Sequence, residues 1–566
     1  MKKIFLSFVS ILVFMGALQC KSTKSQQEVE VKSQGQQKDS GVLVQAIVKK
    51  LSEIADTGSQ TAIKGFFSLL ATAKETGVLE SVVRKVIAHV NSDLPKVEQL
   101  ENINYIMQVV NTELYYRGKD EQSRRLALPS WKEIHDSLQV SHTDEYRKAL
   151  ARAKTQGSPF DDAQFRQQFA KASFGPLVKG ERGELLVNGP KSFAKRKQLL
   201  EVAQQRIYIS SWAIYDDETG KELVNVLKEK HSQGVDIRIM VDGFYSTIKV
   251  FRLQIEELER SGIQVIRWSH PSYPYHGMHR KLFIVDDVHL IAGGMNYGNE
   301  YSHHPALTDP QHRWWDLDFY VKGELAVQAL ELYVHRWNAQ VITQRNSMLT
   351  TISDSIVSNA QRRIKDQPND RPATMHIVDH APAGQRFDPI YETVIKSIYA
   401  ASENIKINMS YFIITPPLKT ALILALKRGV KVTILTNSAE SIDTKILANP
   451  ILESLPELIR EGAQVYLKKG AGIHTKAMMV DDRWGWIGSY NLHPRSYFYE
   501  GEVIIGFFDH PQSEAGIVDQ WNEMFFEQTE KCYRENGCTK ITNINQLKIP
   551  RNMPSKLARA LFYHQL

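Results

Sequence analysis

The chain has few cysteines, no long apolar run beyond its first 20 residues, and no arginine-rich arm. Because no later segment stays apolar for about 18 residues, the mature protein is expected to be soluble apart from an N-terminal anchor. Three cysteines leave one candidate disulfide, Cys532–Cys538, once Cys20 is assigned to that anchor. The absence of a basic arm and of interleaved basic and aromatic residues argues against a nucleic-acid partner.

The composition is that of a soluble globular protein. A length of 566 residues suggests several domains of about 150 residues each. Hydrophobic residues make up 42% of the chain and charged residues 23%, which is ordinary for globular proteins. The formal net charge of +7 is a mild excess. It suits a phosphate-bearing substrate or an anionic membrane surface and does not choose between them.

Residues 1–19 are predicted to be a signal peptide. Lys2 and Lys3 precede an apolar run from Ile4 to Leu18, which is long enough for a signal core and short for a membrane span. The run ends just before Cys20, and this junction resembles a bacterial lipoprotein signal in which Cys20 becomes the lipid-modified residue. Ordinary signal cleavage and an uncleaved anchor remain alternatives.

The signal predicts an exported protein. With a lipid on Cys20 it would be anchored to a bacterial membrane, in the periplasm or at the cell surface, and without the lipid it would be periplasmic or secreted. Residues 20–40 are rich in Lys, Ser, Gln and Glu and are predicted to be a disordered tether. Export into an oxidising compartment favours a disulfide between Cys532 and Cys538 over two free thiols.

Residues 41–174 are predicted to form a helical N-terminal domain. Apolar residues recur at helical spacing, as at Leu43, Ile47 and Leu51, and glycines separate the helices. Nothing in this stretch resembles a catalytic constellation. We interpret its apolar and aromatic residues as core.

From Gly175 onward, short β-branched runs alternate with helices, the pattern of an α/β layer structure. The order strand, helix, strand is expected at 206–210, 220–232 and 235–241, and again at 404–410, 417–428 and 430–435. Three landmarks recur at an interval of 195 residues: Gly234 and Gly429, His279 and His474, Asn296 and Asn491. A register kept over three landmarks indicates an internal duplication.

The duplication predicts two similar α/β sandwich lobes, residues 175–345 and 386–530. Residues 346–385 between them are predicted to be a linker, and residues 531–566 a C-terminal tail. Because both half-sites lie on one chain, a monomer is expected.

Each lobe carries a His-x-Lys motif with an aspartate five residues after the lysine. In a strand, residues two apart point to the same face, so His279 and Lys281 would project together, as would His474 and Lys476. A single His-x-Lys is typical of a solvated strand face. Two copies, each followed by a glycine turn and an asparagine, indicate a function. The two aspartates are Asp286 and Asp481.

These motifs resemble the HxKxxxxD signature that occurs twice in the phospholipase D superfamily. The resemblance runs from Gly175 to Phe526. Its similarity to bacterial cardiolipin synthases extends to four further places: Gly293–Tyr301, Trp314–Asp316, Gly488–Ser496 and Glu502. The chain departs from that pattern at Gly294, at Glu500, where those synthases usually have asparagine, and in lacking their paired transmembrane segments.

The resemblance implies a duplicated phospholipase D fold and a phosphodiester-cleaving enzyme that forms a covalent phosphohistidine. One histidine attacks phosphorus while the other protonates the leaving alcohol and later activates water or another alcohol. By resemblance, His279 is the nucleophile and His474 the general acid and base, although the symmetric sequence also allows the reverse. Lysines and asparagines would neutralise the phosphate, so no metal or other cofactor is expected.

Carboxylates are expected to orient the histidines, because a nucleophilic imidazole requires an acceptor for its other nitrogen. Asp316 and Glu502 match the family positions for this role, with surface salt bridges as the alternative. The motif aspartates are expected to fix the backbone more than to touch substrate. The candidate catalytic residues are His279, Lys281, Asp286, His474, Lys476, Asp481, Asn296, Asn491, Ser489, Asp316 and Glu502.

The expected substrate is a phospholipid at a membrane surface. Hydrolysis and transfer to another alcohol share every residue named above and differ in what reaches the intermediate. The lack of membrane spans favours hydrolysis. The alternatives are a cardiolipin synthase-like transphosphatidylase, a metal-independent nuclease, and a catalytically inactive lipoprotein that binds membranes.

Overall fold

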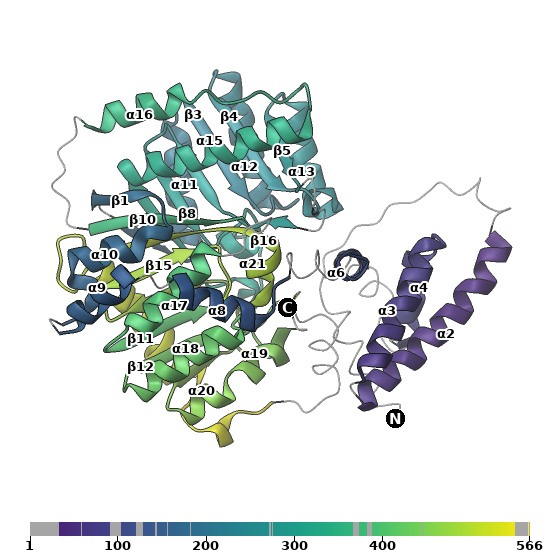
Figure 1. Cartoon of the computed structure of the whole chain (residues 1–566). Coiled ribbons are helices and arrows are strands. Elements are labelled where there is room, and N and C mark those ends of the chain that lie inside the picture. The colour runs from purple at the N-terminus through teal and green to yellow at the C-terminus, as the bar shows by residue number, and fades with distance from the viewer. Residues whose placement is uncertain are drawn as a thin grey trace. The chain divides into compact units, whose positions relative to one another are not determined.

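The computed structural model (Figure 1) describes residues 33–57, 59–90, 103–119, 128–141, 144–155, 157–181, 183–270, 273, 276–365, 373–381, 388–444, 447–549 and 564. The expected signal peptide and Cys20 lie outside the described residues. The chain divides into two compact units. The first is Met1–Leu126 with Asp443–Glu453 and Lys548–Leu566, and the second is Ala127–Ile442 with Ser454–Leu547.

The N-terminal segment of the first unit is helical, as the sequence predicts. Its helices are α2 (Ser33–Thr57), α3 (Gln60–Glu75), α4 (Leu79–Val90) and α6 (Ile103–Arg117). Apolar residues at helical spacing, among them Ile47, Phe66 and Val82, form one core. Ser59 caps α3 by accepting the Ala62 N–H at 3.4 Å. Because α2 begins at Ser33, the last residues of the expected tether are helical.

The second unit begins with helices that the sequence places in the N-terminal domain: α8 (Trp131–Ser141), α9 (Asp144–Lys154) and α10 (Ala163–Phe169). These helices pack against the second lobe. The ring of Phe160 stacks on Trp484 at 6.0 Å, and the Tyr146 hydroxyl donates to Lys396 O at 3.2 Å. Because this aromatic face is buried on the second lobe, the compact units divide near residue 126 and not at residue 174.

The first lobe is built on a seven-stranded sheet of order β2-β9-β8-β7-β3-β4-β5. Its strands are β2 (Gly183–Val187), β3 (Arg206–Ser211), β4 (Asp236–Asp242), β5 (Gln264–Trp268), β7 (Leu282–Val285), β8 (His289–Gly293) and β9 (Leu317–Lys322). Helices α12 (Glu218–Ser232) and α13 (Lys249–Arg260) connect the parallel strands β3, β4 and β5. With α11 (Asn188–Val202) they cover one face, where Ile207 and Ile239 are fully buried.

The second lobe repeats this strand order, so the α/β duplication predicted from the sequence is confirmed. Its sheet runs β1-β10-β16-β15-β14-β11-β12-β13-β17, with β6 (Gly277–Met278) paired to β16. Its strands are β1 (Phe174–Glu181), β10 (Ala373–His380), β11 (Asn404–Met409), β12 (Lys431–Asn437), β13 (Gln464–Lys468), β14 (Lys476–Val480), β15 (Trp484–Gly488), β16 (Glu500–Phe508) and β17 (Cys538–Ile541). The remaining helices are α14 (Asn299–Ser302), α15 (Glu324–Gln344), α16 (Ser355–Lys365), α17 (Pro389–Ala400), α18 (Pro416–Lys427), α19 (Ala448–Ser454), α20 (Pro456–Arg460), α21 (Pro494–Tyr499), α22 (Ile517–Phe526) and α23 (Cys532–Arg534).

The expected linker at 346–385 contains helix α16 and strand β10. In the second sheet β10 lies beside β16, the place that β2 has beside β9 in the first sheet. Every residue of β10 is buried, although its first five residues alternate between apolar and polar side chains. The expected tail at 531–566 also adds a strand to this sheet, β17.

The two lobes share one core. The inner faces of both sheets enclose α15 and α22, and the rings of Phe319 and Phe507 stack 5.8 Å apart across the interface. Arg280, the middle residue of the first motif, forms a buried ion pair with Asp379 of β10, which also pairs with Arg336. Removing one partner of such a buried pair leaves an uncompensated charge, so these residues hold the lobes in one arrangement.

Among the described residues, no helix has both the length and the apolar composition needed to cross a membrane. Near the end of the second unit, Cys532 and Cys538 form a disulfide with their Cα atoms 5.4 Å apart. The bond connects α23 to β17, at the edge of the second sheet.

Candidate active site

The two motif segments are held by backbone hydrogen bonds from the opposite lobe. In the first lobe, β6 pairs with β16, and the His279 N–H donates to Gly501 O at 2.8 Å. In the second lobe, the His474 N–H donates to Trp315 O at 2.7 Å. Both histidines therefore lie at the interface between the lobes.

Each imidazole also contacts a carboxylate of the opposite lobe. His279 Nδ1 lies 3.0 Å from Glu502 Oε2, and His474 Nδ1 lies 2.8 Å from Asp316 Oδ2. Both carboxylate side chains are 0% exposed, which excludes surface salt bridges. Ser496 donates its hydroxyl to Glu502 at 2.7 Å. An acceptor at Nδ1 fixes the ring and leaves Nε2 as the reactive nitrogen.

Burial disfavours the charged form of both imidazoles. It lowers the pKa of His279 well below the usual value, and the charge of Lys281 adds to the shift. Burial and Lys476 also lower the pKa of His474, while Asp316 opposes the change. The charge of Lys476 acts on His279 as well, and that of Lys281 on His474, so the two half-sites form one electrostatic environment.

The two carboxylates differ in their electrostatics. Although burial opposes ionisation, His474 and Lys476 lower the pKa of Asp316. Burial raises the pKa of Glu502, and Lys281 only partly offsets this effect. His474 thus faces the carboxylate that better stabilises a protonated imidazole.

The motif lysines are buried beside the histidine backbones. Lys281 Nζ donates to His279 O at 2.7 Å, and Lys476 Nζ donates to His474 O and, at 3.0 Å, to Ser410 Oγ. Burial lowers the pKa of Lys281 to about 7. A phosphate oxygen would favour the protonated amine, since an opposite charge nearby stabilises the charged form.

The prediction that each histidine lies in a strand with its lysine is wrong in detail. Strand β7 begins at Leu282 and β14 at Lys476, so both histidines precede their strands. Hydrogen bonds from neighbouring strand ends hold these segments instead. The backbone just before each motif strand is therefore fixed by side chains as well as by the backbone hydrogen bonds from the opposite lobe.

Two such side chains were missed by the sequence analysis. Asp242, at the end of β4, accepts the Met278 N–H at 2.8 Å, and Asn437, at the end of β12, accepts the Ile473 N–H at 2.8 Å. Burial raises the pKa of Asp242 to about 6. The two residues are 195 positions apart, so a comparison of the two repeats at this interval would have identified them as equivalent polar residues.

Asn296 and Asn491, the two asparagines 195 residues apart, contact the neighbours of the histidine and lysine of the second motif. Asn296 Nδ2 donates to the Tyr301 hydroxyl at 2.9 Å, and the Tyr301 ring lies 5.1 Å from the His474 ring. Asn491 Oδ1 accepts from Ser410 Oγ at 2.8 Å, the same hydroxyl that accepts from Lys476. Both amides thus belong to the hydrogen-bond network of the site.

Ser489 and Gly294 occupy equivalent positions after β15 and β8. Ser489 Oγ accepts the Val503 N–H at 3.0 Å. A Cβ atom at Gly294 would lie 2.1 Å from Asp316 Oδ1. The first lobe therefore has glycine here because the carboxylate that contacts His474 occupies the space of a side chain.

The motif aspartates contact backbone amides. Asp286 accepts the N–H groups of Gln205 and Arg206 at 2.7 and 3.0 Å, where β3 begins. Asp481 does the same at the start of β11, accepting the N–H groups of residues 402–404. These bonds attach the turn after each motif strand to the neighbouring strand, in line with the expected backbone role.

Aromatic rings surround the histidines. Trp314 stacks near His474 at 5.6 Å, and Trp212 lies edge-on to His279 at 6.4 Å. Trp314 falls within a stretch that the family resemblance had marked, whereas no sequence signal singled out Trp212. The rings limit access of water to the imidazoles, whose side chains are 9% and 11% exposed.

Glu500 lies next to His279 and accepts from Arg495 Nε at 2.7 Å. Against the opposing effect of burial, Arg495 and His279 lower the pKa of Glu500. Within the described part of the chain, His279, Glu500 and Glu502 are the group whose ligand atoms lie within 4.8 Å of one another, as a metal site requires. A metal ion there would compete with the hydrogen bonds from Arg495 and Ser496.

The comparisons with known proteins agree with this geometry. Residues 197–304 and 394–528 match the family described as cardiolipin synthase, PLD-like domain, and the two ranges contain both motifs. The chain belongs to the phospholipase D superfamily. Among its relatives, a cardiolipin synthase of Halalkalibacterium halodurans is 27% identical over 368 residues, 62% of this chain and 69% of that protein. A cardiolipin synthase of Geobacillus thermodenitrificans is 27% identical over 358 residues, 62% and 67% of the two chains.

Among solved structures, the phosphatidylserine synthase of Haemophilus influenzae matches 74% of this chain and 100% of its own, with a TM-score of 0.55 and 16% identity. This likeness shows the phospholipase D fold. The family match and the cardiolipin synthase relatives identify the protein as a phospholipase D-like enzyme.

We expect kcat/KM of this phospholipase D-like enzyme to fall as the pH rises through about 7, the pKa of Lys281 in the free protein. Above that pH the amine loses its proton and its attraction for phosphate, whereas below it the charge is complete and His279 remains neutral. Initial rates between about pH 5 and 9 measure the profile. In Lys281→Arg, which stays charged, the alkaline fall should move to higher pH. An identical profile in both proteins would contradict the assignment.

A second expectation concerns Gly294. Because a side chain at this position would displace Asp316, Gly294→Ser should lower kcat by about 100-fold while the protein stays folded. The reciprocal change, Ser489→Gly, creates no clash and should cost much less. Steady-state rates with a chromogenic phosphodiester, and thermal unfolding followed by circular dichroism, compare the two variants. An equal loss of kcat in both variants would show that the clash between a side chain at residue 294 and Asp316 is not the cause.

Proposed function

We propose that the protein transfers the phosphatidyl group of a phospholipid to the hydroxyl of another lipid, through a covalent phosphohistidine. The observation that carries this proposal is the crossed pairing of His279 with Glu502 and of His474 with Asp316, which joins two half-sites into one. The relatives named cardiolipin synthase support transfer, and the family match of the same description covers both half-sites.

In the first half-reaction, the neutral His279 attacks phosphorus with Nε2. Its lowered pKa keeps a lone pair available, and Glu502 holds the Nδ1 proton. His474 donates a proton to the departing alcohol, since the ionised Asp316 stabilises its protonated form. Lys281 and Lys476 offset the charge that develops on the phosphoryl oxygens.

In the second half-reaction, His474 accepts the proton of the incoming hydroxyl as that oxygen attacks the phosphohistidine. The P–N bond breaks, and His279 leaves as a neutral imidazole. By this scheme the acceptor decides the product: a lipid alcohol gives transfer, and water gives phosphatidic acid. The sequence alone favoured water, whereas the relatives support a lipid alcohol.

The decisive experiment incubates the full-length protein with vesicles of phosphatidylglycerol as the sole lipid and analyses the products by mass spectrometry. We expect cardiolipin and glycerol in equal amounts, because one phosphatidylglycerol donates its phosphatidyl group to the hydroxyl of another. Phosphatidic acid as the main product would make the enzyme a hydrolase. Cleavage of DNA with no change in the lipid would overturn both assignments.

Histidine variants test the roles in that assay. His279→Ala and His474→Ala should each lower turnover by more than about 100-fold, whereas His312→Ala, an exposed histidine elsewhere in the first lobe, should have little effect. With a substrate whose leaving group needs no proton, His474→Ala should accumulate phosphohistidine at position 279. Phosphate found instead on His474 in the His279→Ala protein would reverse the two roles.

We also propose that the protein acts at a bacterial membrane surface, as an exported lipoprotein anchored through Cys20. The signal-like residues 1–19 and the phospholipid substrate proposed above support this location. In cells given radiolabelled palmitate, the wild-type protein should carry the label and the Cys20→Ser protein should not. An unlabelled, cytoplasmic wild-type protein would show that residues 1–19 are not an export signal.

A further inference from the structure

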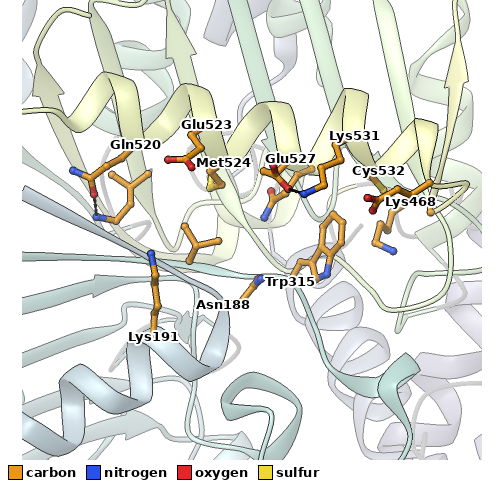
Figure 2. A pocket seen from close by; sticks show the side chains of 15 residues that line it. Asn188, Lys191, Trp315, Lys468, Gln520, Glu523, Met524, Glu527, Lys531 and Cys532 are labelled. Carbon is orange, nitrogen blue, oxygen red and sulfur yellow. Dashed lines mark hydrogen bonds and ion pairs between the residues drawn. The ribbon is translucent and has the colours of Figure 1, made fainter. Parts of the chain in front are cut away.

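A cavity of about 620 Å³ lies in the second unit, next to the candidate active site but with its own lining residues. This volume is within the range of small-molecule binding sites. One wall comes from the first lobe, from the end of β2 and the start of α11. The other comes from the second lobe, along α22 and the turns that follow it (Figure 2).

The floor of the cavity is apolar. Leu185 and Met524 are buried, and Val187 and the ring of Trp315 are partly exposed to the cavity. Lys468 Nζ lies over the Trp315 ring, 4.4 Å from its centre. A hydrocarbon chain would cover this floor and remove apolar surface from water.

The rim carries both positively and negatively charged side chains. Lys191 lies on the α11 wall, whereas Glu523 and Glu527 lie on the opposite wall, and Figure 2 shows them on opposite sides of the cavity. Of these residues, Glu527 is already paired with Lys531 at 2.6 Å. With Lys468 and Glu535 the lining holds three positive and three negative side chains. A zwitterion matches both walls, while a ligand of one sign would meet as much repulsion as attraction.

The second-lobe wall has an unusual backbone. Residues Glu527–Lys531 form a π-helical turn, which supplies three of the lining residues. Such turns are rare and occur frequently at functional sites. The disulfided Cys532 follows directly and also lines the cavity, so the turn is held at its C-terminal end.

Two lining residues contact the catalytic pair. The Asn188 N–H donates to Asp316 O at 2.9 Å, and Asn188 Oδ1 accepts the Asp316 N–H at 3.2 Å. Trp315 O accepts the His474 N–H. The cavity wall thus holds the backbone of both members of the Asp316–His474 pair, and a ligand that shifts Asn188 or Trp315 shifts that pair.

From these observations we propose that the cavity is a second lipid site. It binds a zwitterionic phospholipid, with the phosphate at Lys191, the ammonium group at Glu523, and the apolar part on Met524 and Trp315. Occupancy changes turnover by moving the Asp316–His474 pair. The binding follows from the cavity alone, whereas the effect on turnover depends on the function proposed above.

The test uses a short-chain lysophosphatidylethanolamine that carries a diazirine in its acyl chain, with the full-length His279→Ala protein so that the probe is not consumed. We expect saturable binding and cross-links in peptides that contain Met524 or Trp315. Met524→Trp, which fills the floor, and Lys191→Glu, which reverses one rim charge, should each weaken binding by about tenfold or more. Lys197→Glu, an exposed lysine of the same helix outside the lining, is the matched control and should bind normally.

A lysophosphatidylglycerol of equal chain length, which is anionic, should bind more weakly than the zwitterion. Equal affinity for the two probes, equal binding by Met524→Trp, or cross-links confined to the peptides of the two motifs would overturn the proposal.

In the protein with His279 restored, the zwitterion should change kcat for a chromogenic phosphodiester, and Met524→Trp should abolish this response. Binding without any phospholipid turnover would uphold the cavity site and refute only the proposed function.

Discussion

The hydrogen bonds that cross between the two lobes are the constraint on which the rest of the site depends. Each histidine has both its backbone N–H and its Nδ1 atom satisfied by the opposite lobe. A shift of one lobe within the closed interface would leave Asp316 and Glu502 buried without these partners, and an unpaired buried charge is costly. The interface is therefore stable only in the arrangement that also brings the two imidazoles to one site.

The duplicated half-sites are similar in fold and different in electrostatics. Asp316 stabilises a charged imidazole, whereas the raised pKa of Glu502 and the strongly lowered pKa of His279 favour a neutral one. Asp242 and Asn437, at equivalent positions, also differ: a carboxylate accepts the N–H before His279, and an amide oxygen accepts the N–H before His474. A sequential mechanism needs this asymmetry, since one ring must offer a lone pair while the other holds a proton.

The sequence predicted the two α/β lobes and the four residues of the His-x-Lys motifs, because the register of 195 residues and the motif chemistry are local signals. It did not predict that Asp316 and Glu502 would cross between lobes, since that pairing is a property of long-range packing. Strand β10 was placed in the expected linker, because its partners β1 and β16 lie far from it in the sequence and only long-range packing brings them together. Asn188 had no signal, because its contacts with Asp316 depend on long-range packing, whereas Trp315 lies within the stretch Trp314–Asp316 that the family resemblance had marked.

One consequence follows from the presence of both half-sites on a single polypeptide. The fold fixes the effective concentration of one half beside the other, so catalytic capacity per molecule does not decline on dilution as it would for a site shared by two separable subunits. In a symmetric pair of identical chains every substitution would appear twice. Here a change on one side, such as aspartate at 242 where its counterpart at 437 is asparagine, can be selected alone, and evolution could specialise the two imidazoles independently.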